Sequence, residues 1–536
     1  MRQSIVALVL AGVVLASCQP VAGPWPLATV PSETPRSTPT QPAIASAGMS
    51  TPGGLSSPSP DLPRAPVTPA SRDTPEAPTP AGGTPYLAAL RPEASASLGK
   101  VDDLTHYDLD VSLSADVKSI GGLARIRYTN RKGVPLDTVY LHLFPNLWED
   151  GMQVSDVREG GRPAQVKRLA GDAIIGVVLP EPLLPGSSID LSMTFTTPIP
   201  SGEGVGNYGE LAYQGGVLAL AHFYPTVVVY DDGWHLETPS SQGDVIYHDA
   251  SLYDVRLTAP AGLTVVSTGA TMNRADNGDG SATWRLVGGP MRDFNIVTSR
   301  LYRSETRQVG DVAVNSYFRP EDVDGGALVL GWAAQALSIY EQAFGPYPYR
   351  ELDIVETATT AGGIEYPGMV VVAESLYSGP ERRAFFEAAA VHEVAHQWWY
   401  NVVGNDQVNT PWLDEALAQY SAYLYFQDVY GSAGGQGFLD GMNERWARVD
   451  YADKPIGLPV GDYAGREYGA IVYGRGPLFL VALRDRIGEA QMAELIRRYY
   501  SEYAWKLAQP DDFQKLAEAV WGQSLDDLFD KWVYPK

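Results

Sequence analysis

The chain has 536 residues, enough for two or three domains, and its hydrophobic content of 45% is ample for sizeable cores. Its formal net charge is −24, with an isoelectric point near 4.7. Nucleic-acid-binding proteins need a basic surface, so this charge argues against that class. The acidic balance favours an extracytoplasmic surface protein.

Residues 1–17 have the pattern of an export signal. A basic start is followed by an apolar run, Ile5 to Val14, that is too short to cross a bilayer as a helix. The run leads into the letters LASC, which resemble a bacterial lipobox and end at Cys18, the only cysteine of the chain. We therefore predict an exported lipoprotein, anchored through lipid on Cys18 to the extracytoplasmic side of a bacterial membrane.

Two regions follow the signal. Residues 18–95 are rich in Pro, Ser and Thr and bury too little apolar surface to fold, so we predict a disordered linker. Residues 96–305 show strand-like alternation, as at Tyr107, Leu109, Val111 and Leu113, and are expected to form a β-rich domain. Five of the seven histidines lie in that domain without ligand spacing and are expected to be structural or surface residues.

The remainder, residues 306–536, is predicted to be a mostly helical domain. Its expected helices span residues 327–344, 382–403, 411–429, 477–487, 490–500 and 511–521. Strands are expected at 352–356 and 369–372, on either side of Gly362-Gly363. These glycines follow a strand but open no helix, which argues against a nucleotide-binding loop.

One pentapeptide carries most of the chemical information. His392-Glu393-Val394-Ala395-His396 places two imidazoles one helical turn apart, on one face of a helix. Such a pair binds Zn²⁺, with Glu393 as the natural general base. A catalytic zinc needs three protein ligands and an open position for water. The segment after His396 has no further histidine, so the third ligand is expected to be a carboxylate.

Glu415 is the predicted third ligand. Thr410 suits a helix N-cap and Pro411 suits the first helical position, so Glu415 is expected about one turn inside a new helix. The intervening loop can fold that helix back onto the first. The neighbouring Asp414 is expected to be an ordinary solvated acid of the first turn.

Together, these segments resemble the M1 family of zinc aminopeptidases, within the gluzincins. HEVAHQWW is followed after eighteen residues by Glu415 in WLDEALAQY. Gly362-Gly363-Ile364-Glu365-Tyr366 is similar to the family's Gly-x-Met-Glu-Asn exopeptidase motif. Val472-Tyr473-Gly474-Arg475-Gly476 is similar to its Tyr-x-Lys-Gly segment. The resemblance covers roughly residues 100 to 536, without the long C-terminal helical domain of many members.

The resemblance implies a multidomain α+β fold, with a saddle-like β-rich domain before a thermolysin-like α/β catalytic domain. It also implies that Tyr473 stabilises the transition state and that Gly362, Gly363 and Glu365 bind substrate, Glu365 through the free α-ammonium. Tyr366 replaces the family's Asn, which puts the shape of the amine subsite in question. The family's N-terminal-domain glutamine has no clear counterpart, with Gln214 as one candidate.

The expected function is therefore a zinc aminopeptidase that holds one Zn²⁺ per chain and acts on peptides with a free N-terminus. Two alternatives stay open. The same metal centre also suits a zinc endopeptidase or another amide or epoxide hydrolase. A non-catalytic surface lipoprotein is the third possibility, although the intact set of predicted site residues argues against it.

Overall fold

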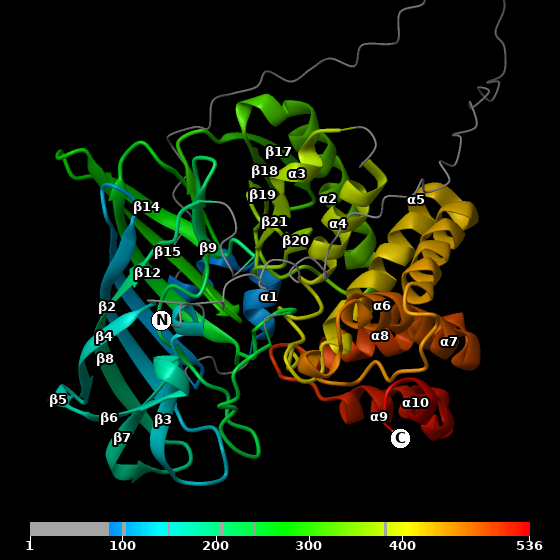
Figure 1. The fold of residues 1–536 in the computed structure, drawn as a ribbon, viewed down its shortest axis with the longest axis horizontal. Coiled ribbons are helices and arrows are strands. Elements are labelled where there is room, and N and C mark those ends of the chain that lie inside the picture. Colours follow the sequence, from blue (N-terminus) through cyan, green and yellow to red (C-terminus); the bar gives the residue numbers. More distant parts are fainter. Residues whose placement is uncertain are drawn as a thin grey trace, which may run out of the picture.

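A computed structural model describes residues 85–98, 103–147, 151–202, 208–240, 242–379 and 383–535. The predicted signal, Cys18 and most of the predicted linker lie outside these ranges. The described residues form a β-rich part and a helix-rich part that lie side by side (Figure 1). The expected α+β, multidomain architecture is confirmed.

The N-terminal part contains three sheets within the described ranges. The largest has the strand order β14 (Ala270–Asp276), β15 (Ser281–Met291), β12 (Ser251–Pro260), β1 (Thr105–Leu113), β2 (Ser119–Thr129), β8 (Ser188–Pro198), β4 (Gln153–Glu159) and β5 (Arg162–Pro163). The second has the order β13 (Thr264–Ser267), β16 (Ile296–Ser299), β10 (Val217–Leu220) and β9 (Leu211–Gln214). The third has the order β11 (Thr226–Val227), β3 (Leu136–His142), β7 (Ile174–Leu183) and β6 (Gln165–Leu169).

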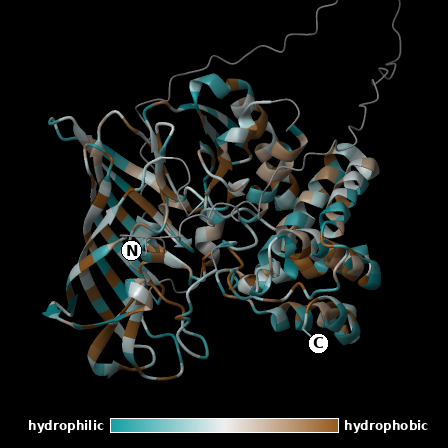
Figure 2. Ribbon diagram, viewed as in Figure 1, coloured by the Kyte–Doolittle hydropathy of each residue, from teal (hydrophilic) through white to brown (hydrophobic). Residues whose placement is uncertain are grey.

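Alternating side chains explain why the large sheet buries one face. Along β1, Tyr107, Leu109, Val111 and Leu113 are buried, and the residues between them are partly or fully exposed. Brown and teal positions alternate along these strands in Figure 2. Since neighbouring strand residues point to opposite faces, this pattern places one face in the core.

The helix-rich part begins with a mixed sheet of order β17 (Arg303–Val309), β18 (Val312–Phe318), β19 (Glu351–Thr357), β21 (Met369–Ala373) and β20 (Gly363–Ile364). β18, β19 and β21 run parallel, and β20 pairs antiparallel with β21 at the edge. Since β17 begins at Arg303, the sheet starts slightly before the predicted domain boundary at residue 306. The position of β20 at the edge matters because it carries the predicted exopeptidase motif.

The described α-helices are α1 (Pro92–Ser97), α2 (Val323–Ala343), α3 (Glu374–Tyr377), α4 (Arg383–Ala395), α5 (Trp412–Ala447), α6 (Glu467–Ala470), α7 (Gly476–Ile487), α8 (Glu489–Tyr503), α9 (Pro510–Trp521) and α10 (Asp526–Trp532). Shorter helical turns are η1 (Pro85–Ala89), η2 (Phe144–Leu147), η3 (Ala170–Asp172), η4 (Pro320–Asp322), η6 (Val460–Asp462) and the π-turn η7 (Ile471–Arg475). None of the helices in the described ranges is both long enough and apolar enough to span a bilayer.

Residues 85–95, which the sequence assigns to the linker, are instead packed against the helix-rich part and the large sheet. Arg91 forms ion pairs with Asp311 at 2.7 Å and with Glu341 at 2.6 Å. Its backbone N–H donates to Pro348 O at 2.8 Å, and Leu90 bridges to Tyr349. The turn η1 contributes buried apolar residues, such as Ala88 and Ala89. Their burial explains why this stretch folds although its composition resembles that of a linker. We refer to residues 85–98 as the N-terminal clamp.

Candidate metal centre and active site

The two histidines of the pentapeptide lie at the end of a helix. The predicted helix over residues 382–403 is wrong in its extent, because α4 ends at Ala395 and turns follow. His396 therefore lies just beyond the last helical residue, with its N–H still 3.4 Å from His392 O. Tyr400 adopts a φ of 97°, a conformation incompatible with helix, so the chain reverses here. The imidazole Nε2 atoms still meet, 3.1 Å apart.

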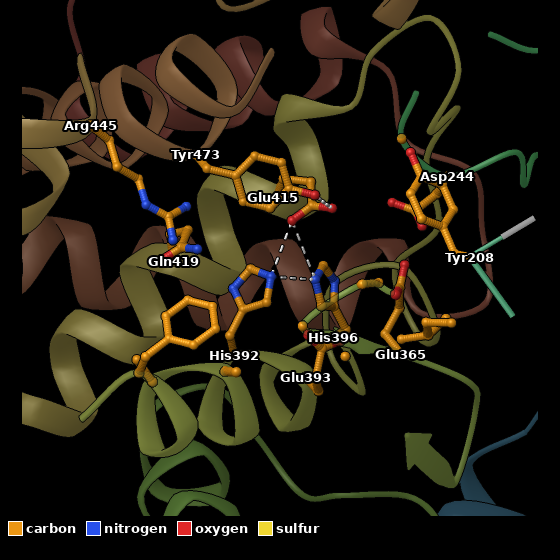
Figure 3. A pocket seen from close by; sticks show the side chains of 18 of the residues that line it. Tyr208, Asp244, Glu365, His392, Glu393, His396, Glu415, Gln419, Arg445 and Tyr473 are labelled. Carbon is orange, nitrogen blue, oxygen red and sulfur yellow. Dashed lines mark hydrogen bonds and ion pairs between the residues drawn. The ribbon is translucent and has the colours of Figure 1, made fainter. Parts of the chain in front are cut away.

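Glu415 comes from the first turn of α5 and faces both histidines. Its Oε2 lies 3.1 Å from His392 Nε2 and 3.6 Å from His396 Nε2 (Figure 3). The helix begins at Trp412, so Thr410 is not the N-cap; its hydroxyl donates to Asp406 O at 3.0 Å instead. The predicted ligand is therefore in place, although the predicted cap is wrong.

The three groups fit a zinc ion. In a tetrahedral site with bonds of about 2.0–2.2 Å, ligand atoms lie about 3.3–3.6 Å apart, close to the separations here. His396 Nδ1 lies 3.0 Å from Trp399 O, and donation to that carbonyl leaves the Nε2 lone pair aimed at the other two groups. The Oε2 atom of Glu415 is buried and accepts no hydrogen bond. Acceptors converging in a buried space are unfavourable unless a cation lies between them.

Glu393 lies beside the ligands and is held by a close backbone approach. It is 6% exposed. A Cβ added to Gly363 would lie 2.4 Å from Glu393 Cγ, so the edge strand β20 can approach α4 only with glycine at this position. Burial, together with the carboxylate of Glu365, raises the pKa of Glu393 well above its ordinary range. A raised pKa makes it easier for Glu393 to hold a proton. A general base needs this property, because it takes up a proton and later passes it on.

Glu365 follows β20 and is oriented by a side chain that the sequence did not single out. The amide of Gln407 donates to Glu365 Oε1 at 2.8 Å and to Asp414 Oδ2 at 2.6 Å. Asp414 is fully buried and also accepts from Asn405 at 3.0 Å, so its predicted solvated position is wrong. Burial and the charge of Glu415 raise the pKa of Asp414 to about 8.

Tyr473 lies on the π-turn η7, and its hydroxyl donates to the Glu415 carboxylate. Such turns widen a helix locally and recur at functional sites. Arg475, which lies two residues further along the same segment, does not line the cavity that holds the metal ligands. It is buried, donates to Lys454 O at 2.6 Å and stacks over Trp532 at 4.8 Å. Arg475 therefore secures η7 rather than contacting substrate.

The predicted site residues share one cavity of about 830 Å³, including its open mouth. The lining includes Gly362, Gly363, Glu365, His392, Glu393, His396, Glu415 and Tyr473. It also includes charged and amide side chains that the sequence analysis did not single out: Glu210, Asp244, Gln419 and Arg445. Of these, Asp244 lies near Glu365, and Gln419 and Arg445 lie on the other side of the histidines (Figure 3).

Two points left open by the sequence are answered by a second, smaller cavity behind Glu365. Tyr366 lines that cavity and not the larger one, so its bulk does not fill the described part of the site beside the metal ligands. Gln214 lines neither of these cavities, whereas Glu210, four residues before it, lines both. The Glu210 carboxylate lies 3.1 Å from His222 Nε2. Gln214 is therefore not part of the described lining of the site, and Glu210 is.

Comparison with known proteins supports this assignment. The model of the peptidase family M1 domain matches residues 329–532. Aminopeptidase M1 of Arabidopsis thaliana is 25% identical over 238 residues, 42% of this chain and 27% of that protein. Endoplasmic reticulum aminopeptidase 1 of Rattus norvegicus is 22% identical over 438 residues, 76% of this chain and 45% of that protein. The chain thus spans about a quarter of the plant relative's length.

The fold is also similar to that of solved structures. An M1 zinc metallopeptidase from Deinococcus radiodurans superposes with a TM-score of 0.61 at 20% identity, over 81% of this chain and 93% of that one. A variant of that peptidase bound to Tyr-Ser-Ala gives a TM-score of 0.62. The expected fold, a β-rich domain followed by a helix-rich domain, is therefore confirmed, and residues 329–532 match the model of the peptidase family M1 domain.

Proposed function

We propose that this protein is a zinc-dependent aminopeptidase that hydrolyses the first peptide bond of peptides with a free N-terminus. One observation carries the proposal. A three-residue zinc site, a buried glutamate at its side and a second buried glutamate, Glu365, line a single cavity. The peptide-bound fold neighbour from Deinococcus radiodurans supports a peptide as substrate.

The chemistry follows from the residues around the site. Zn²⁺ bound by His392, His396 and Glu415 would supply Lewis-acid activation of the scissile carbonyl and of the attacking water. Glu393 accepts the proton of that water and passes it to the leaving nitrogen. The Tyr473 hydroxyl donates a hydrogen bond to the oxyanion as its charge develops.

Glu365 determines where the chain is cut. A carboxylate pairs strongly with an α-ammonium group through charge-assisted hydrogen bonds. Because Glu365 lies beside His396, a substrate whose amine it holds presents its first peptide bond to the metal ligands. An N-acetylated peptide would leave the buried Glu365 carboxylate without a cationic partner, at a cost of about 1–3 kcal/mol.

The test compares aminoacyl-amide substrates with their N-acetylated counterparts, with and without a chelator. We expect release of the first residue from the free substrates only, and none after chelation. Glu365→Gln should lower kcat/KM for free substrates while the zinc content stays at that of the wild type. Internal cleavage of acetylated peptides at the same rate would instead support the endopeptidase alternative. Zinc binding without hydrolysis of any substrate would favour a non-catalytic role.

We further propose that the enzyme acts at the outer face of a bacterial membrane, held by lipid on Cys18. Support comes from the sequence, in which the lipobox-like LASC follows a short apolar run. Cys18 itself lies outside the residues that the structure describes. Metabolic labelling with a fatty acid should mark the wild type but not Cys18→Ala. The variant should also leave the membrane fraction. Wild-type protein that retains Met1 and stays wholly aqueous would contradict the anchor.

A further inference from the structure

The active-site cavity has opposite charges at its two ends. Glu365 and Asp244 lie at one end, and Arg445 and Gln419 lie at the other (Figure 3). The metal ligands lie between them. Glu210 also lines the cavity, and it shares the smaller second cavity with Glu365 and Asp244. Among the described residues that line the cavity, Arg445 is the one lysine or arginine. A single cation at one end of a cavity that is otherwise lined by acidic groups indicates that this end binds a negatively charged group of the ligand.

Helix α5 builds this second end by reversing its direction. Gly431 has a φ of 69°, which interrupts the helix and divides it into two arms. The two arms pack against each other: the rings of Phe426 on the first arm and Phe438 on the second are stacked, with their centroids 5.2 Å apart. A Cβ added to Gly435 would lie 3.1 Å from Gln427 Cβ, so glycine permits this close packing.

Both arms present one face to the cavity. Glu415 and Gln419 are four residues apart on the first arm, and Phe438, Met442 and Arg445 are spaced by four and three on the second. Residues at these spacings share a helix face. Arg445 is also packed against the η7 backbone, since a Cβ added to Gly474 would lie 3.0 Å from Arg445 Cβ. The base of the Arg445 side chain is therefore held against the turn that carries Tyr473, and both side chains line the cavity.

The direction in which a peptide lies in the cavity follows from the proposed function, and the inference rests on that function. With the α-ammonium held by Glu365 and the scissile carbonyl at the metal ligands, the residue after the scissile bond extends toward Gln419 and Arg445. One extended residue spans about 3.3–3.6 Å. A guanidinium binds a carboxylate with two parallel hydrogen bonds, and an adjacent amide offers a further donor.

We propose that Arg445, assisted by Gln419, binds a carboxylate carried by the residue that follows the scissile bond. Two sources supply that chemistry: the C-terminal carboxylate of a dipeptide, and the side chain of an acidic second residue in a longer peptide. Phe438 and Met442 line the same face and pack against the carbon atoms of that residue. Arg445 is thus a specificity-determining residue on the leaving-group side.

The test uses two matched substrate pairs with the zinc-loaded enzyme. Leu-Gly is compared with Leu-Gly-amide, and Leu-Glu-Ala-amide with Leu-Gln-Ala-amide. We expect the wild type to favour the carboxylate member of at least one pair by about 10- to 100-fold in kcat/KM, as a charge-assisted contact provides. A preference in the first pair assigns the subsite to dipeptides, and one in the second pair assigns it to acidic side chains.

Arg445→Gln should bring that ratio close to one, and Arg445→Lys should restore part of it, because lysine keeps the charge without the planar fork. Arg448→Gln is the matched control, since Arg448 is exposed at the end of the same helix. Equal rates within both pairs for the wild type, or a ratio retained in Arg445→Gln, would overturn the inference. Failure of the proposed function is distinguishable, because no member of either pair would then be hydrolysed.

Discussion

The Gln407 amide donates a hydrogen bond to Glu365 at 2.8 Å and, through the same nitrogen, one to Asp414 at 2.6 Å. A loop residue thus ties the proposed amine-binding carboxylate to the helix that carries the third metal ligand. Burial raises the pKa of Glu365, and the bond from Gln407 partly offsets that rise. Gln407 is therefore a positioning residue whose hydrogen bond favours the ionised form of Glu365.

The first prediction concerns this bond. Gln407→Leu removes the donor, so the pKa of Glu365 should rise further and less of the carboxylate should be ionised at a given pH. The ascending limb of kcat/KM against pH is expected to move to higher pH, with the zinc content unchanged. Asn409→Ala is the control, because Asn409 lies on the same loop but bonds Asp406 and Glu237. An unmoved limb would show that Gln407 is only structural.

The second prediction tests the close approach of β20 to α4. The methyl group of Gly363→Ala would displace the Glu393 carboxylate, because the added carbon would lie 2.4 Å from its Cγ. A shift of about 1 Å in a catalytic group costs on the order of 100-fold in rate. We expect a loss of that size in kcat with little change in Tm. Gly461→Ala, in open space, is the comparison variant, and equal kcat in the two variants would contradict the argument.

The third prediction concerns the metal. His396→Ala should lose both zinc and activity, because it removes one of three ligands. Glu393→Gln should retain zinc and lose turnover, since Glu393 lies beside the ligand set without belonging to it. Atomic absorption of the purified variants measures the metal, and one Zn²⁺ per chain is expected for the wild type. Full activity in metal-free protein would refute the assignment.

The fourth prediction separates catalysis from folding at Tyr473. Tyr473→Phe removes the hydroxyl that donates to Glu415 and is proposed to donate to the oxyanion. We expect kcat to fall by about 10²–10³, the range for one oxyanion donor, with KM and Tm near those of the wild type. Tyr468→Phe is the control, as its ring lies 5.5 Å from that of Tyr473. The assignment fails if Tyr468→Phe has the larger effect.

The fifth prediction concerns pH and stability. His235 Nε2 lies 2.7 Å from Asp231, and its Nδ1 lies 3.1 Å from Glu237 and 3.8 Å from Asp406 in the helix-rich part. Partial burial lowers the pKa of His235, but the bond and charge of Asp231 outweigh it, so the pKa is raised above 6.5. The stabilisation is therefore present in full below pH 6.5 and lost as pH rises through the folded-state pKa. The Tm gap between wild type and His235→Gln should be widest at pH 6 and shrink toward pH 9; a constant gap would count against this account.

The metal centre was predictable because its signal is local. His392 and His396 are one turn apart, and a carboxylate on the next helix was the remaining ligand type. Where the chain leaves α4 was not predictable, since the reversal depends on the φ of 97° at Tyr400, a residue with no marked turn preference. The buried state of Asp414 was equally hidden, because it depends on amides that reach it from Asn405 and Gln407.

The second arm of α5 was missed for a different reason. The predicted helix ends at residue 429, where several glycines begin, and glycine weakens isolated helices. In the folded protein these glycines permit close packing, as at Gly435, and tertiary contacts outweigh the propensity. Arg445 therefore had no local signal that could connect it with the metal ligands. Its position in the cavity is a product of the fold.

The N-terminal clamp has a consequence for how the chain assembles. Arg91 contacts residues 220 to 256 positions later in the chain, at Asp311, Glu341 and Tyr347. During synthesis the clamp leaves the ribosome long before its partners exist, and contacts so distant in sequence form slowly. The contacts of Arg91 can therefore form only after its partners have been synthesised, so they fasten the N-terminal clamp to the helix-rich part late in folding. A chain shortened to begin after residue 98 lacks these contacts, and its helix-rich part should be cut more readily by proteases.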